Sequence, residues 1–223
     1  MAALLLGLQA AEVPAADTDD VSAKAAPVII YKPPVRGAPK TRVGAGSRGS
    51  GDAAVLQVLA PDHTGLTTVG QPTLYWYAST PGLAHFEVAL IDAESIDPLL
   101  EVEAEDGMMA GIHHLNLEDY GLSLQPGTPY QWSVALVADA DNRSSDLVAS
   151  GLIERIEPDE ELANRISNSS GVDLVNVYAS AGIWYDALHE LSTLITESPD
   201  DAALIALRDN LLEQVDLQAV TGH

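Results

Sequence analysis

The side chains that could do chemistry in this 223-residue chain are mostly carboxylates. Asp139, Asp141 and Asp146 lie in the segment DADNRSSD, and carboxylate oxygens are the ligands that calcium prefers. The common twelve-residue calcium loop also needs a central glycine and a distal glutamate, and this segment has neither. We therefore expect an acidic hairpin loop here and keep a calcium site at these three aspartates as the alternative.

The other candidate ligands are glutamates and histidines on predicted strands. Glu101, Glu103 and Glu105 share one face of a strand, which indicates a solvated edge, or alternatively a diffuse site for a divalent ion. His113 and His114 are adjacent, so their side chains point to opposite faces of a strand and cannot chelate one ion. None of these residues forms a recognisable ligand pattern.

No catalytic signature is present. The chain contains no GxSxG, HExxH, GxGxxG or P-loop motif. It also has no cysteine, which excludes disulfides, thiolate nucleophiles and cysteine-ligated zinc. We therefore assign no catalytic residue and no cofactor, and we expect binding rather than catalysis.

Charge divides the chain into two parts. Residues 1–51 carry a net charge of +2 and residues 52–223 carry −25, within a total of −23. Because phosphate binding needs lysine and arginine on the contacting face, the acidic body excludes nucleic acids and anionic membranes as partners. We interpret the acids as a solvated surface; adaptation to salt and a cation-binding face are the alternatives.

The N-terminal part divides into two segments. Residues 1–11 combine an apolar run with small residues, which resembles a truncated signal peptide and predicts a periplasmic or secreted protein. That run is too short to cross a bilayer, and no later segment qualifies. Residues 12–51 are rich in proline, glycine and basic residues without periodicity, which predicts a disordered linker. The alternative is that the basic stretch from Lys32 to Arg48 docks on the acidic body.

Seven alternating segments in residues 52–156 predict the strands that must carry these side chains. We place them at 54–59, 73–78, 85–91, 99–104, 111–117, 130–138 and 147–156. Short strands at even spacing predict an antiparallel β-sandwich of the immunoglobulin or fibronectin III kind. Trp76 and Trp132 are the expected core anchors. Tyr75 and Tyr77 lie on the opposite face of their strand, and exposed aromatic side chains there would favour glycan binding.

Residues 157–223 are predicted to be a helical appendage, so the fold class is α+β. We expect a first helix opening at Glu157-Pro158, then helices near 173–181 and 184–196, and a last helix capped by Ser198. Residues 174–199 resemble a single tetratricopeptide-type helical hairpin, in which an aromatic residue, a glycine turn and a proline mark the unit. Its interaction and packing residues are Tyr178, Gly182, Trp184, Tyr185 and Ala187. We expect Trp184 to fill the junction between the helices and the sandwich.

The order of the motifs KPPVRGAP, PTLYWY, YQWSV and GIWYDAL resembles the bacterial family called domain of unknown function 928, over roughly residues 32–217. The resemblance implies an exported protein without an established activity. Related sequences often carry cysteines just after the glycine-rich stretch and near the end of the sixth predicted strand. This chain has Gly51 to Ala54 and Ala138 there, so a disulfide between linker and sandwich is absent.

These observations favour a structural or protein-interaction module of the cell envelope, with an envelope protein as its partner. A carbohydrate- or calcium-binding module, with its ligand on the sandwich loops, is the alternative. A hydrolase that uses paired carboxylates is less favoured still.

Overall fold

The computed structural model describes residues 28–34, 42–43, 45–46, 54–79, 85–92, 95, 97–104, 109–137, 139, 141–217 and 220. The predicted signal segment 1–11, most of the predicted linker 12–51, and the positions Glu105 and Ala138 lie outside the described residues. No helix in the described part of the chain is both long enough and apolar enough to cross a membrane.

The fold is α+β, with two sheets and four helices among the described residues. The strands are β1 (Ala45–Gly46), β2 (Val55–Val58), β3 (Gly65–Thr67), β4 (Thr73–Ala78), β5 (His85–Asp92), β6 (Leu100–Ala104), β7 (Gly111–Asn116), β8 (Pro129–Val137) and β9 (Leu147–Arg155). Two 3-10 helices, η1 (Leu117–Tyr120) and η2 (Arg143–Ser145), follow β7 and β8. The helices are α1 (Glu160–Ser167), α2 (Gly171–Ser180), α3 (Trp184–Glu197) and α4 (Ala202–Glu213). Each of the seven predicted strands coincides with an observed strand to within one residue at either end.

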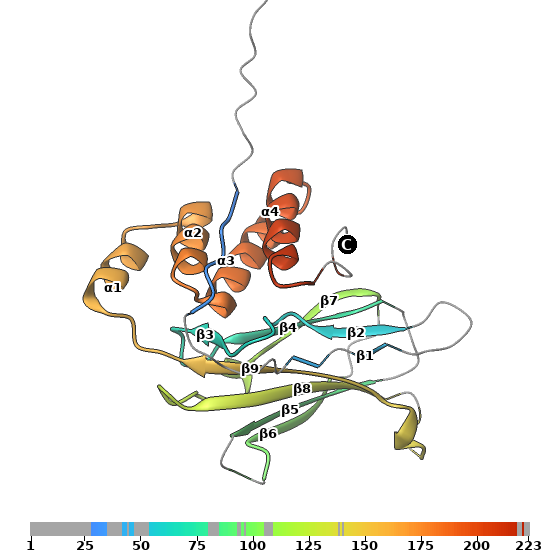
Figure 1. The fold of residues 1–223 in the computed structure, drawn as a ribbon. Helices are drawn as coiled ribbons and strands as arrows, with labels where there is room; N and C mark the ends of the chain where they lie inside the picture. The colour runs from blue at the N-terminus through green and yellow to red at the C-terminus, as the bar shows by residue number, and fades with distance from the viewer. Residues whose placement is uncertain are drawn as a thin grey trace, which may run out of the picture.

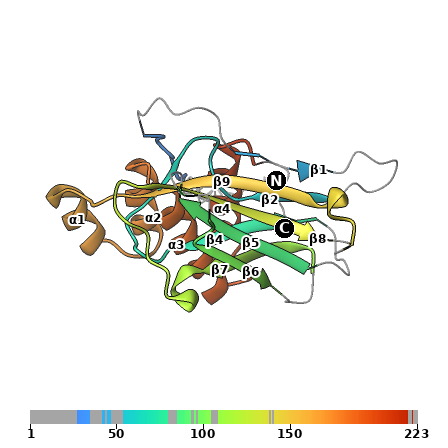
Figure 2. The same cartoon turned by 90° about the horizontal axis from the view of Figure 1, so that it is seen from below.

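The elements form three layers. One sheet has the order β1-β2-β4-β7 and the other has the order β3-β9-β8-β5-β6. Figure 1 shows the helices above the four-stranded sheet and the five-stranded sheet below it. Seen from below, the five-stranded sheet lies in front and the helices lie behind (Figure 2). The four-stranded sheet is therefore the middle layer, covered on both faces.

Strand β4 shows the consequence of this layering, because it is buried along its whole length. Trp76 faces the five-stranded sheet, where its ring meets Phe86 edge-on at 5.4 Å between centroids. Tyr75 faces the helices, and its hydroxyl lies 3.0 Å from Nδ1 of His189. Tyr75 and Tyr77 are only 7% and 3% exposed, so this strand presents no row of exposed aromatic side chains.

The prediction of a purely antiparallel arrangement is wrong at one strand pair. Strand β3 runs parallel to β9, with Gly65 opposite Ile153 and Thr67 opposite Arg155. Three residues are too few to show an alternating pattern, and tertiary contacts create the strand instead. A side chain at Gly65 would lie 2.6 Å from the ring of Tyr185, so glycine permits the close approach of α3 to β3.

The predicted starts of two helices are wrong by a few residues. The first helix begins at Glu160 rather than at Glu157-Pro158, because Asp159 is its N-cap and accepts a hydrogen bond from the Leu162 amide. The last helix is capped by Asp201 rather than by Ser198, through the amides of Ala203 and Leu204. In both places an aspartate carboxylate satisfies the first free amides of the helix.

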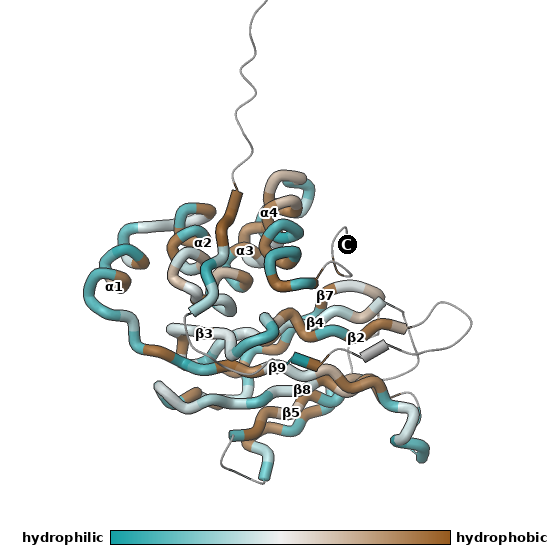
Figure 3. Tube along the Cα trace, viewed as in Figure 1, coloured by the Kyte–Doolittle hydropathy of each residue, from teal (hydrophilic) through white to brown (hydrophobic). Residues whose placement is uncertain are grey.

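The prediction of a disordered linker over 12–51 does not describe residues 28–34. In Figure 3 this segment begins as a brown, hydrophobic stretch between α2 and α4. Ile29 and Tyr31 are buried against the helices, and Arg42 donates hydrogen bonds to the carbonyl oxygens of Ala60 and Val215. The docking alternative placed Lys32 to Arg48 on an acidic surface, whereas Ile29 and Tyr31 make apolar contacts and Arg42 binds backbone carbonyls. Composition does not reveal such an anchored segment, because two inward side chains with backbone hydrogen bonds suffice to hold a short stretch of chain.

Candidate functional site

The N-terminal segment 28–34 lies between α2 and α4, where the side chain of Gln214 binds its backbone, and we call this position the helical groove. The amide of Tyr31 donates to Oε1 of Gln214 at 2.8 Å, and Nε2 of Gln214 donates to the carbonyl oxygen of Ile29 at 2.8 Å. The amide of Lys32 donates to the carbonyl oxygen of Ala179 on α2 at 3.0 Å. An amide side chain that pairs with both a backbone donor and a backbone acceptor recognises an extended chain whatever its sequence.

Two inward side chains add selectivity to this groove. Ile29 and Tyr31 are two residues apart and are buried on the same side of the extended segment. The ring of Tyr31 meets Trp184 edge-on at 5.1 Å between centroids, and its hydroxyl lies 3.2 Å from Nε2 of His63. Burial raises the pKa of Tyr31 and lowers the pKa of His63, so a neutral phenol and a neutral imidazole share this hydrogen bond.

The outer side of the same segment is exposed. Val28 and Ile30 are 63% and 60% exposed. With Val177 of α2 they line a shallow outer pocket of about 300 Å³. Lys32 and Arg165 flank this outer pocket. An apolar surface with two cations stands out on a body whose net charge is −25.

A second cleft, of about 330 Å³, lies where α2 and α3 meet the loops around β3 and β4. Asp186 lies at its base and accepts hydrogen bonds from the Thr67 hydroxyl at 2.5 Å, the Thr68 amide at 2.9 Å and the Thr68 hydroxyl. Burial raises the pKa of Asp186 and lowers the pKa of His189 beside it. Because both carboxylate oxygens of Asp186 accept hydrogen bonds from Thr67 and Thr68, this residue ties α3 to β3.

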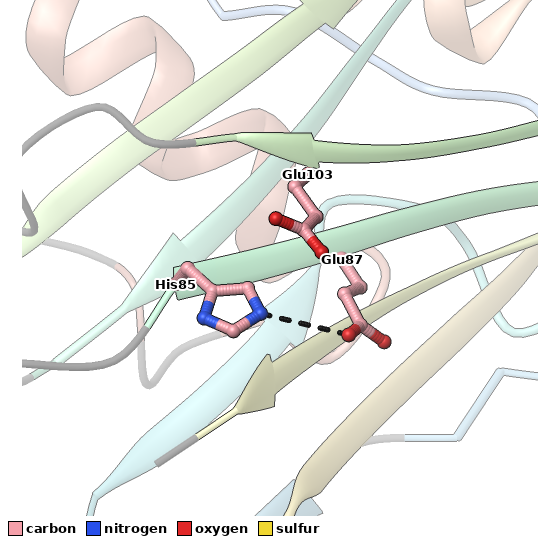
Figure 4. A group of neighbouring side chains, drawn as sticks. All are labelled: His85, Glu87 and Glu103. Carbon is pink, nitrogen blue, oxygen red and sulfur yellow. Dashed lines mark ion pairs between the residues drawn. The ribbon is translucent and has the colours of Figure 1, made fainter. Parts of the chain in front are cut away.

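The outer face of the five-stranded sheet carries one group of potential metal ligands within the described ranges. His85, Glu87 and Glu103 each offer one ligand atom, and these atoms lie within 4.8 Å of one another. Figure 4 shows the three side chains on adjacent strands, with Nε2 of His85 3.5 Å from Glu87. Arg143 donates to both carboxylate oxygens of Glu87 at 2.7 and 2.5 Å and lowers the pKa of that carboxyl. A cation would therefore have to displace the guanidinium group.

The three aspartates of the predicted acidic hairpin loop, which were also the alternative calcium site, form no group of potential metal ligands in the described part of this loop. Asp146 receives the Nε of Arg143 at 2.6 Å, and Asp139 accepts the backbone amide of Asp141 at 3.0 Å. Asp139 and Asp141 are exposed. The loop instead positions Arg143 over the neighbouring strand β5, where it meets Glu87.

The acidic body leads to a prediction about salt. We expect the thermal midpoint to rise with sodium chloride, because screening weakens the repulsion among the excess carboxylates. Each kcal/mol of repulsion that screening removes should raise the midpoint by roughly 2–4 °C. Differential scanning calorimetry at low and molar salt measures this, with millimolar magnesium and calcium as parallel samples. An equal midpoint at both salt levels contradicts the prediction, whereas a gain specific to calcium would support an ion site.

The remaining residues that the sequence singled out lie in the interior. Trp76, Trp132, Trp184, Tyr185 and Ala187 are buried, Tyr178 is half-buried, and Gly182 occupies the turn between α2 and α3. Two of these, Trp132 and Tyr185, meet across the layers. The indole of Trp132 donates to the Tyr185 hydroxyl at 2.8 Å, and that hydroxyl donates to the carbonyl oxygen of Leu152 at 3.0 Å. The indole of Trp184 donates to the carbonyl oxygen of Leu59 at 2.8 Å.

The residues that build the helical groove could not be predicted from the sequence. Gln214 and His63 carry no local signal, because their partners are distant in sequence. Ile29 and Tyr31 did carry one: the run VIIY precedes a lysine and two prolines, and alternate burial of a short extended segment is typical of such a run. The absence of a longer period concealed it.

Comparisons with known proteins give one informative result. The family model described as Domain of Unknown Function (DUF928) matches residues 43–223. None of the curated proteins matches the chain. Among solved structures, a crystal structure of an engineered protein aligns with 10% identity and a TM-score of 0.32, over 46% of this chain and 20% of that one. That likeness is too low to carry an argument. The match to the family model covers most of the sequence, so the chain belongs to the DUF928 family.

Proposed function

We propose that this protein is a protein-interaction module of the bacterial cell envelope, and that its helical groove binds extended polypeptide segments. The observation that carries the proposal is the pairing of Gln214 with the backbone of residues 29 and 31. Recognition of an extended chain through its backbone, with pockets for alternate side chains, is a common mode of peptide binding. In this proposal the chain's own segment 28–34 occupies the site in cis.

Binding rather than catalysis fits the chemistry of the described clefts. The carboxylate of Asp186 is committed to two threonines, and the hydroxyl of Thr73 donates to the side chain of Asn116. A hydrolase needs a base that is free to take a proton from a nucleophile. The proposal of an exported protein rests on the apolar segment 1–11, and a partner in the periplasm or outside the cell follows from it.

We also propose a relationship for each of the two parts of the fold, the pair of sheets and the helical hairpin. The two facing sheets support an immunoglobulin or fibronectin III relationship, and the pair α2 and α3 joined at Gly182 supports a tetratricopeptide-like hairpin. A glycan-binding role would need exposed aromatic side chains, and Tyr75 and Tyr77 are buried. We therefore favour a polypeptide over a glycan as the ligand.

The proposal predicts that the groove binds its own segment in trans once the cis copy is released. The probe is a fluorescent peptide with the sequence of residues 25–34, AAPVIIYKPP. We expect no binding by the wild-type protein, because the tethered segment has an effective concentration of about millimolar. The double variant Ile29→Ser, Tyr31→Ala should bind the peptide, as measured by fluorescence anisotropy.

Two controls make this test specific. Adding Gln214→Ala to the double variant should abolish binding, and a peptide with the same two substitutions should not bind. Circular dichroism must show that each variant keeps its helices and strands. A folded double variant that does not bind the wild-type peptide would show that segment 28–34 is only a structural tie.

A further inference from the structure

Strand β7 is an edge strand whose outer backbone groups have no partner in the described part of the chain. It is the last strand of the order β1-β2-β4-β7 and pairs with β4 alone. The amide of Leu117 donates to the carbonyl oxygen of Pro72, which fixes the phase of the antiparallel ladder. Alternate residues bond in such a ladder, so the amides and carbonyls of Ile112, His114 and Asn116 point away from β4.

Proteins usually protect such edges, and the other three edges of these sheets are protected. Strands β1 and β3 have two and three residues, which is too short to template a new strand. Strand β6 carries Glu101 and Glu103, and charged side chains on an edge oppose pairing. Strand β7 has six residues, GIHHLN, without proline, lysine or a carboxylate. It is the edge in the described structure that lacks a protective device.

A groove of about 520 Å³ runs along this edge. Five consecutive residues of β7, from Ile112 to Asn116, line it, so the backbone edge itself forms one wall. Trp76 and Phe86 line its inner side, and the Trp76 indole N–H finds no acceptor in the described ranges. Figure 2 shows β6 and β7 at the same side of the two sheets.

We propose that β7 is a docking edge that binds an extended, basic segment of a partner protein as an added strand. The three outward residues supply the backbone donors and acceptors for a β-ladder. Glu103 and Asp119 flank the groove, and the body carries −25, so lysine or arginine in the partner strand is favoured. Strand β7 itself contains no lysine or arginine, so a second copy of this chain would bring no cation to these carboxylates. This site is separate from the helical groove and does not depend on it.

The test uses the full-length protein and a labelled peptide in which lysine and valine alternate. Residue-resolved amide hydrogen exchange should show new protection at Ile112, His114 and Asn116 on peptide addition. The amides of His113 and Leu115 already bond to β4 and should not change. The variant His114→Pro removes one outward amide, and proline is tolerated at such an edge position, so the peptide should bind about tenfold more weakly.

The matched variant His114→Ala keeps the amide and should bind as the wild type does. A peptide that alternates glutamate and valine, at equal ionic strength, should bind more weakly than the lysine peptide. Uniform or absent protection along β7, or equal binding by His114→Pro and His114→Ala, would overturn the docking edge. Equal binding of both peptides would overturn the preference for a basic partner. Protection of β7 that appears without peptide and grows with protein concentration would assign the edge to a second copy instead.

Discussion

Replacing Trp184 by alanine should lower the free energy of unfolding by about 3–5 kcal/mol, because it leaves a cavity where three parts of the fold meet. The side chain is fully buried, its indole donates to the carbonyl oxygen of Leu59, and its ring supports Tyr31. The truncation therefore removes packing from the helices, the four-stranded sheet and the N-terminal segment at once. Urea unfolding followed by circular dichroism measures the change.

Two further variants separate the contributions to this loss. Trp184→Phe keeps much of the ring and loses the hydrogen bond, so it should cost about 1–3 kcal/mol for the unsatisfied carbonyl of Leu59. Val148→Ala, at a side chain that is 46% exposed on β9, should change stability by less than about 0.5 kcal/mol. If Trp184→Ala were as stable as Val148→Ala but no longer captured an envelope partner, the indole would be an interface anchor instead of a core residue.

Gly182→Ala should release the N-terminal segment from the helical groove. The residue has φ of +78°, and a Cβ atom there would lie 2.7 Å from the carbonyl oxygen of Lys32. The left-handed conformation costs a residue with a side chain about 1–2 kcal/mol, and the clash adds roughly 1–3 kcal/mol. Hydrogen exchange should then rise at the amides of Tyr31 and Lys32, which bond to Gln214 and Ala179.

Gly171→Ala is the matched control for this prediction. Gly171 also has a positive φ, of +57°, but a Cβ atom there would meet nothing within 4 Å. It should therefore show the conformational cost alone, with unchanged exchange at residues 31 and 32. Equal exchange at these amides in both variants would mean that Gly182 does not hold the segment in place.

The sequence predicts the parts of this fold that depend on local periodicity. Strands such as Thr73–Ala78 and helices such as Trp184–Glu197 follow directly from alternation and from an apolar stripe. The division between inward and outward residues on β5 follows as well, since Phe86, Val88 and Leu90 are buried. Local patterns predict whether a segment is a strand or a helix, and which of its faces is buried.

Features that depend on distant partners could not be predicted in this way. Strand β3 exists because Asp186 binds Thr67 and Thr68 and because Gly65 allows close contact with Tyr185. The burial of Tyr75 depends on the helical layer that lies over β4. Neither effect leaves a periodic trace, because single hydrogen bonds and single close contacts between distant segments set them.

The pairing of Gln214 with residues 29 and 31 has a consequence for how the chain is made. These partners are 183 and 185 positions apart, so the segment is synthesised early and binds its partner only after Gln214 has been made. Until Gln214 has been synthesised, Ile29 and Tyr31 lack the carboxamide that binds their backbone, and a nascent chain exposes them. Exposure of this segment therefore distinguishes an incomplete chain from a finished one.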